Sequence, residues 1–217
     1  MKNIYAIYKP KGPTSHDIIN QLRRITGVKR IGHAGTLDPL ASGVLLVGIT
    51  REGTRELSKY IGCDKEYIAT IRFGETSETD DAEGKKQLTD NNRQITKIQI
   101  KNILKQFIGK IKQVPPVYSS VKVQGKPAHR RVRAGQKIIL GARDVEIYSI
   151  KILSYKYPYL KIKVVCSSGT YIRSLARDIG QKLKVGAYLS DLERTRVGDF
   201  KIENCCDVDD FQKIIFD

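Results

Sequence analysis

Long hydrophobic runs are missing from this chain, since no run approaches the roughly 18 apolar residues that a membrane-spanning helix needs. The N-terminus reads MKNIYAIYKPKG, so Lys9 and Pro10 arrive before the apolar core of a signal peptide could form. We therefore expect no membrane partner and no export, and we expect a cytoplasmic protein.

Residues that bind metals or form disulfides are also scarce. The four cysteines show no CxxC spacing, and the three histidines show no HExxH or similar spacing. They are Cys63, Cys166, Cys205, Cys206, His16, His33 and His129. This pattern argues against a zinc site and provides no disulfide framework, so we expect reduced thiols and no metal-dependent mechanism.

Acidic residues are few relative to basic ones. The chain has 39 Lys and Arg but only 23 Asp and Glu, which gives a formal net charge of +16. The 53 residues from Asn91 to Arg143 hold 13 Lys and Arg and no Asp or Glu. Such a segment attracts phosphates and predicts salt-dependent binding to a polyanion. The alternative is a solvated surface in a generally basic proteome.

With 217 residues and 40% hydrophobic content, the chain can bury a sizeable core. Apolar alternation, or an unbroken apolar run, predicts strands at residues 3–9, 43–49, 65–74 and 160–166. Helix-start residues and apolar residues at helical spacing predict helices at 14–27, 54–62, 96–111 and 169–183. The prolines and glycines between residues 113 and 140 are too irregular for one element, which favours a long functional loop.

One short stretch, GHAGTLDPLASG at residues 32–43, carries a single carboxylate among turn-forming residues. A tight turn explains its glycines and its proline. It does not explain Asp38. A turn-forming aspartate before proline is the structural alternative to a catalytic carboxylate.

Four blocks of sequence resemble a known family. They are GHAGTLDPLASGVLLVGI, KEYIATIRFGETSETDDAEG, VPPVYSSVKVQGK and CSSGTYIRSLARDIGQKL. In order and interval they are similar to the bacterial tRNA pseudouridine-55 synthases of the TruB type, from about Ile7 to Phe200. The resemblance implies an α/β pseudouridine synthase fold, with a mixed, mostly antiparallel sheet surrounded by helices and loops. It also implies one catalytic domain over residues 1–217, with a thumb-like insertion at about 113–140.

The implied reaction is the isomerisation of uridine to pseudouridine in the T-loop of tRNA, by a monomer without metal or organic cofactor. Asp38 matches the essential aspartate, so the turn would serve to present its carboxylate. Cleavage of an N-glycosidic bond creates positive character at C1′, which a carboxylate can stabilise or attack. Bonding to C1′, addition to C6 of the base and proton abstraction all remain open.

Further site residues are implied by the same resemblance. Arg173 matches an arginine that pairs with the aspartate, and its alternative is an exposed arginine facing phosphate. Tyr67 matches a tyrosine that stacks on the uracil and helps to remove the C5 proton, although a strand tyrosine is usually core. Tyr171 and Leu192 match residues that line the pocket, and either could equally be ordinary packing.

Two more residues match family positions, one that contacts the RNA and one that supports the loop of Asp38. His33 matches a histidine that replaces the extruded nucleotide in the T-loop stack, where a stacked ring offsets part of the cost of base flipping. Lys9 matches a lysine beneath the active-site loop, with a surface charge as its alternative. Phosphate contacts are expected from the basic residues of the thumb, namely Lys122, Lys126, Arg130, Arg131 and Arg133.

The chain departs from the family pattern in three places. Tyr8 stands where an acidic residue is usual, AHRRVR replaces the common motif of the thumb, and the given sequence ends soon after RTRVGDF, so we expect no C-terminal RNA-binding PUA domain. Either the catalytic domain works alone and binds tRNA through its basic charge, or the chain is a fragment. Two rival functions remain: a pseudouridine synthase for another RNA, and a noncatalytic protein that binds or folds RNA. The motif GTLDPLASG favours the tRNA type, and the trio Asp38, Tyr67 and Arg173 favours an enzyme.

Overall fold

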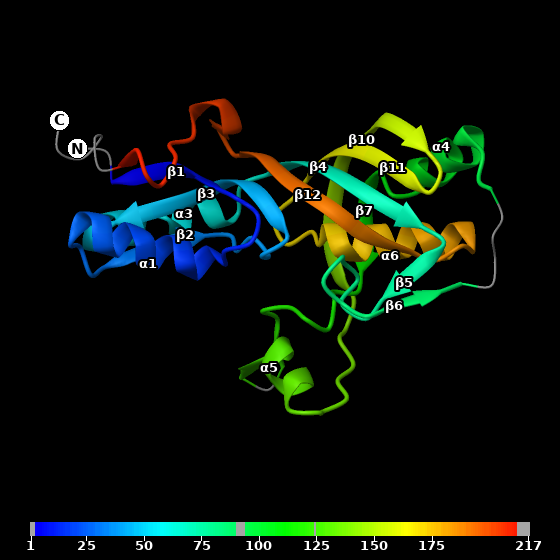
Figure 1. Cartoon of the computed structure of the whole chain (residues 1–217), viewed down its shortest axis with the longest axis horizontal. Helices are drawn as coiled ribbons and strands as arrows, with labels where there is room; N and C mark the ends of the chain where they lie inside the picture. The colour runs from blue at the N-terminus through cyan, green and yellow to red at the C-terminus, as the bar shows by residue number, and fades with distance from the viewer. Residues whose placement is uncertain (1–2, 90–93, 124, 212–217) are drawn as a thin grey trace. The chain divides into compact units, whose positions relative to one another are not determined.

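The computed structural model describes residues 3–89, 94–123 and 125–211 (Figure 1). The chain divides into two compact units, of which unit 1 comprises Met1–Ile68 and Leu192–Asp217, and unit 2 comprises Ala69–Asp191. Strands β4 (Lys65–Phe73) and β12 (Ala187–Val197) each contribute residues to both units.

The other elements lie within one unit. Unit 1 contains β1 (Ile4–Lys9), α1 (Ser15–Thr26), β2 (Ile31–Ala34), β3 (Ala41–Ile49), α2 (Thr50–Glu56), α3 (Ser58–Ile61), β13 (Phe200–Lys201) and η1 (Ile202–Asn204). Unit 2 contains β5 (Glu75–Ser77), β6 (Lys86–Leu88), α4 (Lys97–Lys105), β7 (Gly109–Gln113), β8 (Lys122–Val123), β9 (Lys126–Pro127), α5 (Ala128–Arg133), β10 (Arg143–Lys156), β11 (Tyr159–Cys166) and α6 (Ile172–Leu183).

The main sheet has the strand order β1-β3-β12-β4-β11-β10-β7, with β2 beside β3 and β13 beside β12. The pair β3–β12 is parallel, whereas β1–β3, β2–β3, β12–β13, β10–β11 and β7–β10 are antiparallel. This mixed, mostly antiparallel sheet with its helices confirms the predicted fold class.

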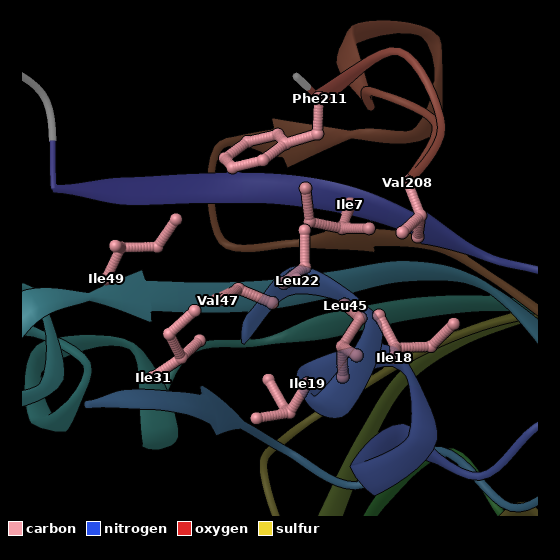
Figure 2. Packing of buried hydrophobic residues seen from close by; sticks show 10 residues of the cluster. All are labelled: Ile7, Ile18, Ile19, Leu22, Ile31, Leu45, Val47, Ile49, Val208 and Phe211. Carbon is pink, nitrogen blue, oxygen red and sulfur yellow. The ribbon is translucent and has the colours of Figure 1, made fainter. Parts of the chain in front are cut away.

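Strand β3 forms the centre of the core of unit 1, and all nine of its residues are buried. On one face Leu45 and Val47 pack with Ile18 and Leu22 of α1, as Figure 2 shows. Phe211 completes this cluster from the C-terminal segment. Burial of each such side chain contributes about 1.5–3 kcal/mol, so the cluster fixes α1 against the sheet.

Helix α1 begins and ends where its sequence predicts. Thr14 and Asp17 form a reciprocal capping box at the N-terminus, which satisfies two backbone N–H groups that lack helical partners. Gly27 ends the helix in the left-handed conformation at φ 69°, which glycine adopts without steric cost.

The predicted helix at 96–111 is too long, because α4 ends at Lys105. Gly109 has φ 97° and begins β7, where Ile111 pairs with Val145 of β10. The apolar residues after Lys105 therefore continue the helical spacing without belonging to the helix, since strand pairing with β10 decides their conformation.

Unit 2 carries the segment that the sequence marks as an irregular excursion. Figure 1 shows α5 and the strands beside it in green, at the end of two long connections that leave the main sheet. A small apolar cluster of Val121, Ala128 and Leu140 is buried within this segment. No helix in the described ranges is long and apolar enough to cross a membrane.

Candidate active site

Asp38 lies in the short connection between β2 and β3 of unit 1. The backbone N–H of Ala41 donates to the carbonyl of Asp38 at 3.0 Å, which closes a turn with Pro39 at its second position. Proline favours that position because its φ is already fixed near the required value. Asp38 itself is half-buried, so the turn holds the carboxylate at the boundary between core and solvent.

Ser15, at the start of α1, clamps the residue that precedes Asp38. Its Oγ donates to the carbonyl of Leu37 at 3.0 Å and accepts from the N–H of Leu37 at 2.9 Å. Ser15 and Leu37 are both buried. The clamp therefore satisfies both polar backbone groups of Leu37 where water does not reach them.

Lys9, at the end of β1, supports the other side of the turn. Its Nζ donates to the carbonyls of Ala41 at 2.7 Å, Pro10 at 2.8 Å and Pro39 at 3.4 Å. The side chain has no exposed surface, so the alternative of a solvated surface lysine is wrong. Lys9 braces the backbone on the C-terminal side of Asp38.

Arg194 of β12 is a third brace, and sequence reasoning missed it. It is 1% exposed, and it donates from Nε to the carbonyl of Val44 and from Nη2 to the carbonyl of Gly35, both at 2.8 Å. The sequence signal is its spacing, because Arg194 has the same strand parity as buried Leu192. A charge at an inward-facing position indicates a buried polar role.

Replacement of Ser15 by alanine tests the clamp. We expect a loss of about 1–3 kcal/mol in the free energy of unfolding, because the buried N–H and C=O of Leu37 lose their partner. We also expect a lower kcat, since the turn that carries Asp38 loosens. Urea unfolding, and hydrogen exchange at the amide of Leu37, measure the two effects.

The matched control is Ser58→Ala, which removes an exposed hydroxyl that donates to the carbonyl of Arg55 at 2.8 Å. We expect this variant to lose no more than about 0.5 kcal/mol. Equal stability and equal amide exchange in the two variants would contradict the role assigned to Ser15.

His33 lies on β2, opposite Val47 of β3, and is half-buried. Burial is the first cause that lowers the pKa of its imidazole, and the positive charges of Arg194 and His16 lower it further. Nδ1 has no hydrogen-bond partner among the described residues. The lowered pKa favours the neutral ring, which suits stacking better than proton transfer.

Leu192 and Tyr67 are both buried residues of unit 1. Leu192 of β12 pairs in register with Ala41, the first residue of β3 after the turn. Tyr67 lies on the buried side of β4, between Lys65 and Ala69. The structure therefore places Lys9, Ser15 and Leu192 directly around the turn, whereas the chemical role of Tyr67 stays a prediction.

Arg173 is buried at the start of α6 in unit 2, so the alternative of an exposed arginine facing phosphate is wrong. Its guanidinium donates to the carbonyls of Tyr118 at 2.9 Å and Thr79 at 3.2 Å. Nη1 lies 3.6 Å from Oδ2 of Asp81, a carboxylate that is 2% exposed and that sequence reasoning missed. Arg173 thus links two parts of unit 2. It binds Thr79 and Asp81 in the acidic connection that follows β5, and it binds Tyr118 in the segment that follows β7.

Arg177, one turn later on α6, repeats this arrangement. It forms an ion pair with Asp80 at 2.7 Å and donates to the carbonyl of Val114 at 2.9 Å. Burial is the larger influence on Asp80 and raises the pKa of its carboxyl, although Arg177 opposes the shift. Asp80 also holds φ at 61°, so the acidic connection is fixed in a conformation that side chains other than glycine rarely adopt.

Tyr171 caps the start of α6 and connects it to β7. The side-chain amide of Gln113 accepts from the N–H of Tyr171 at 2.8 Å and donates to its carbonyl at 3.1 Å. The side chain of Tyr171 packs against the apolar cluster of Val121, Ala128 and Leu140. This half-buried contact agrees with the packing alternative for Tyr171 and leaves its role in a pocket a prediction.

The basic residues of the thumb divide into two groups. Lys122, Lys126, Arg130 and Arg133 are exposed. Arg131 is half-buried, and it donates to the carbonyl of Val123 at 3.1 Å and to the side chain of Gln136 at 3.2 Å. Four of the five predicted phosphate contacts are therefore accessible, whereas Arg131 also holds the thumb together.

No cluster of His, Cys, Asp and Glu within the described ranges could hold a metal ion. The side chains that gather around the turn are one carboxylate, buried cations and a hydroxyl. Because Lys9, Arg194 and Ser15 bind the backbone of the turn, the carboxylate of Asp38 is the group that we expect to act on positive charge in a substrate.

Solved structures share the fold of this chain. The chain matches the protein in "Crystal Structure of a Cbf5-Nop10-Gar1 Complex" with TM-score 0.77 and 30% identity, over 98% of this chain and 54% of that one. It matches the protein in "Structure of H/ACA RNP bound to a substrate RNA containing 2'-deoxyuridine" with TM-score 0.72 and 28% identity, over 98% and 53%. The chain therefore spans about half the length of these two solved chains.

Sequence comparison identifies the family. Residues 23–172 match the TruB family pseudouridylate synthase N-terminal domain, and residues 173–217 match the tRNA pseudouridylate synthase B C-terminal domain. The chain belongs to the TruB family of pseudouridylate synthases. Relatives named "tRNA pseudouridine synthase B" are 45% identical in Corynebacterium diphtheriae, over 93% of this chain and 69% of the relative, and 46% identical in Protochlamydia amoebophila, over 94% and 78%.

Proposed function

We propose that this enzyme isomerises uridine to pseudouridine at position 55 in the T-loop of tRNA, with Asp38 acting on the extruded nucleotide. Membership of the family and relatives named as tRNA enzymes support the substrate class. The observation that carries the assignment of Asp38 is its turn, which is held by Lys9 and Ser15 through the backbone on both sides of it.

The chemistry needs no water and no group donor. The C1′–N1 bond breaks with its electron pair on the uracil, which leaves as a delocalised anion, while positive character develops at C1′. The ionised carboxylate of Asp38 meets that charge. The base then turns, C5 bonds to C1′, the proton of C5 departs and N1 gains a proton, so the atoms of substrate and product balance.

The remaining residues have supporting roles in this proposal. Tyr67 stacks on the uracil and assists the loss of the C5 proton. Arg173 keeps the carboxylate of Asp38 ionised, since a guanidinium is charged at every accessible pH. His33 takes the place of the extruded base, and its lowered pKa leaves a neutral ring for that purpose.

The exposed lysines and arginines of the thumb bind the phosphates of the RNA. These contacts hold the RNA but do not read its base sequence. The enzyme acts as a monomer, with Tyr171 and Leu192 lining the nucleoside pocket. Binding of the T-arm is then expected to weaken as salt rises, because each phosphate contact releases counterions.

Release of tritium from T-arm RNA labelled at C5 of uridine tests the function. We expect the enzyme to release one equivalent from RNA with uridine at position 55, and none from that site when cytidine stands there. Undiminished release from the cytidine RNA would reject position 55, and the lack of release from any tRNA would favour another RNA target.

A further inference from the structure

The thumb leaves the main sheet of unit 2 through residues 114–118, which we call the thumb root. This segment follows directly on Gln113, the last residue of β7, and its sequence is VPPVY. Pro115 and Pro116 are both buried. Each proline ring fixes φ of its own residue and restricts the residue before it, so the thumb root is stiff. Its attachment points therefore decide the direction in which the thumb projects.

Helix α6 holds the thumb root at both of its ends. The carbonyl of Val114 accepts from Oγ of Ser174 at 2.8 Å and from Nη2 of Arg177 at 2.9 Å. The carbonyl of Tyr118 accepts from Nη2 of Arg173 at 2.9 Å. Because a carbonyl oxygen has two lone pairs, Val114 is bound to α6 through its full acceptor capacity.

Arg177 is itself held in place by two carboxylates. Its Nη1 lies 2.7 Å from Oδ2 of Asp80, and its Nη2 lies 2.9 Å from Oδ1 of Asp178. The side chains of Arg177 and Asp80 are only 21% and 15% exposed, so salt screens this pair less than a pair on the open surface. A guanidinium is planar, and contacts to several of its N–H groups fix its orientation.

Asp80 is anchored through its backbone. Its carbonyl accepts from the N–H of Leu189 in β12 at 3.0 Å, and its N–H donates to the carbonyl of Ser77 at 3.1 Å. Its φ of 61° further restricts the residue. A continuous series of bonds thus leads from the main sheet through Asp80 and Arg177 to Val114 of the thumb root.

The charges of the thumb divide between two tasks. The two carboxylates beside Arg177 compete with any phosphate for its guanidinium, and its side chain is mostly buried. Accessible cations lie instead beyond the thumb root, and they are Lys122, Lys126, Arg130 and Arg133. Arg177 is therefore suited to orient the thumb, whereas the exposed cations are suited to contact phosphate.

We propose that Arg177 is a positioning residue for RNA binding, which uses Asp80 as its counterion to fix the thumb root and so presents the exposed cations of the thumb to the T-arm. Neither side chain binds the RNA itself. The inference rests on the proposed function, because it takes the thumb as a surface that binds tRNA. It deepens that function by assigning the affinity for the T-arm partly to an internal ion pair.

Two variants with opposite changes in charge test this inference. Arg177→Gln removes a positive charge, and Asp80→Asn removes a negative one. If Arg177 contacted phosphate directly, loss of Asp80 would free the guanidinium, and Asp80→Asn would bind RNA more tightly. A positioning role predicts weaker binding in both variants. Asparagine adopts positive φ at least as readily as aspartate, so Asp80→Asn adds no backbone strain.

We expect Arg177→Gln to raise the Kd for fluorescent T-arm RNA by about tenfold, and Asp80→Asn by about threefold, at one fixed salt concentration. KM should rise in parallel, whereas kcat should change less than about twofold, because the residues proposed for the chemical step are unchanged. The double variant should bind no more weakly than Arg177→Gln, since the two residues act as one unit. Fluorescence anisotropy and tritium release measure these quantities.

Lys182→Gln and Asp144→Asn are the matched controls. Lys182 is exposed in the last turn of α6, and Asp144 is exposed on β10. Each variant removes one charge of the same sign as its test variant from a residue outside the thumb root. Exposed charges of this kind contribute little, so the Kd of each control should change less than about twofold.

Limited trypsin digestion reports on the thumb without RNA. Cleavage after the exposed Arg130 and Arg133 should be faster in both test variants than in both controls, because a thumb with a loosened root opens more often. A general loss of stability would instead speed cleavage along the whole chain. Cleavage of the thumb at the rate of the controls would contradict the positioning role.

The binding and activity data together separate this inference from the proposed function. Tighter RNA binding by Asp80→Asn, or unchanged binding by Arg177→Gln, overturns the inference. If the unmodified enzyme releases no tritium from T-arm RNA while both test variants bind that RNA more weakly, the proposed function fails and the positioning role stands. If release is normal and the binding pattern is absent, only the positioning role fails.

Discussion

Asp38→Asn is expected to reduce the rate of tritium release by at least about 10³-fold while leaving the affinity for tRNA within about twofold. Asparagine keeps the size and turn-forming ability of aspartate, but its neutral amide can neither attack C1′ nor balance positive charge there. The loss should therefore appear in kcat under saturating RNA, and not in binding. Single-turnover release and filter binding on the same preparations measure the two quantities.

Asp144→Asn is the matched control, because it removes an exposed carboxylate that pairs with Lys112. Exposed ion pairs contribute little, so both rate and affinity should stay near those of the unmodified enzyme. Thermal unfolding of Asp38→Asn should remain cooperative, since the bonds from Ala41 and Ser15 to the backbone of the turn are kept and asparagine has the size of aspartate. Equal rates for Asp38→Asn and the parent would refute the proposed role of Asp38.

The second large effect concerns Gly43 of β3, which pairs in register with Arg194 of β12. Gly43 has φ 106°, a conformation that L side chains rarely adopt. A Cβ there would overlap the backbone oxygen of Arg194 and lie 2.8 Å from its nitrogen. Gly43→Ala should therefore destabilise the protein by about 2–5 kcal/mol, from backbone strain and overpacking together.

Activity should fall with stability in Gly43→Ala, because a displaced β12 moves Arg194 away from the carbonyls of Gly35 and Val44. Gly62→Ala provides the comparison, since Gly62 has φ −79° and no atom within 4 Å of the added carbon. We expect this control to lose no stability and to gain up to about 1 kcal/mol. A Gly43→Ala protein as stable as Gly62→Ala would contradict the tight contact.

Sequence patterns predicted elements well where a single physical effect dominates. The apolar run of β3, the alternation of β4 and the capping box of α1 each specify one conformation. The end of α4 was wrong because Ile111 fits a helical stripe equally well, and only the distant partner β10 decides that it belongs to a strand. Non-local pairing of this kind leaves no local trace.

In the candidate site, too, sequence predicts the local features and misses the contacts between distant residues. The turn around Asp38 is readable from its glycines and proline, and Lys9 was placed beneath it by family resemblance. Ser15 and Arg194 were missed because each side chain binds backbone groups far away in sequence, 22 and 159 residues from Leu37 and Gly35. The strand parity of Arg194 indicates an inward-facing side chain, but it does not identify the backbone groups that this side chain binds.

The division of unit 1 between the two ends of the chain has a consequence for biosynthesis. Arg194, which braces the turn of Asp38, and Phe211, which completes the core beside α1, both belong to a segment that is synthesised long after Asp38. The parallel pairing of β3 with β12 must wait for that segment, and contacts so distant in sequence form slowly. A nascent chain therefore contains Asp38 long before it can form the contacts that fix the turn around this residue.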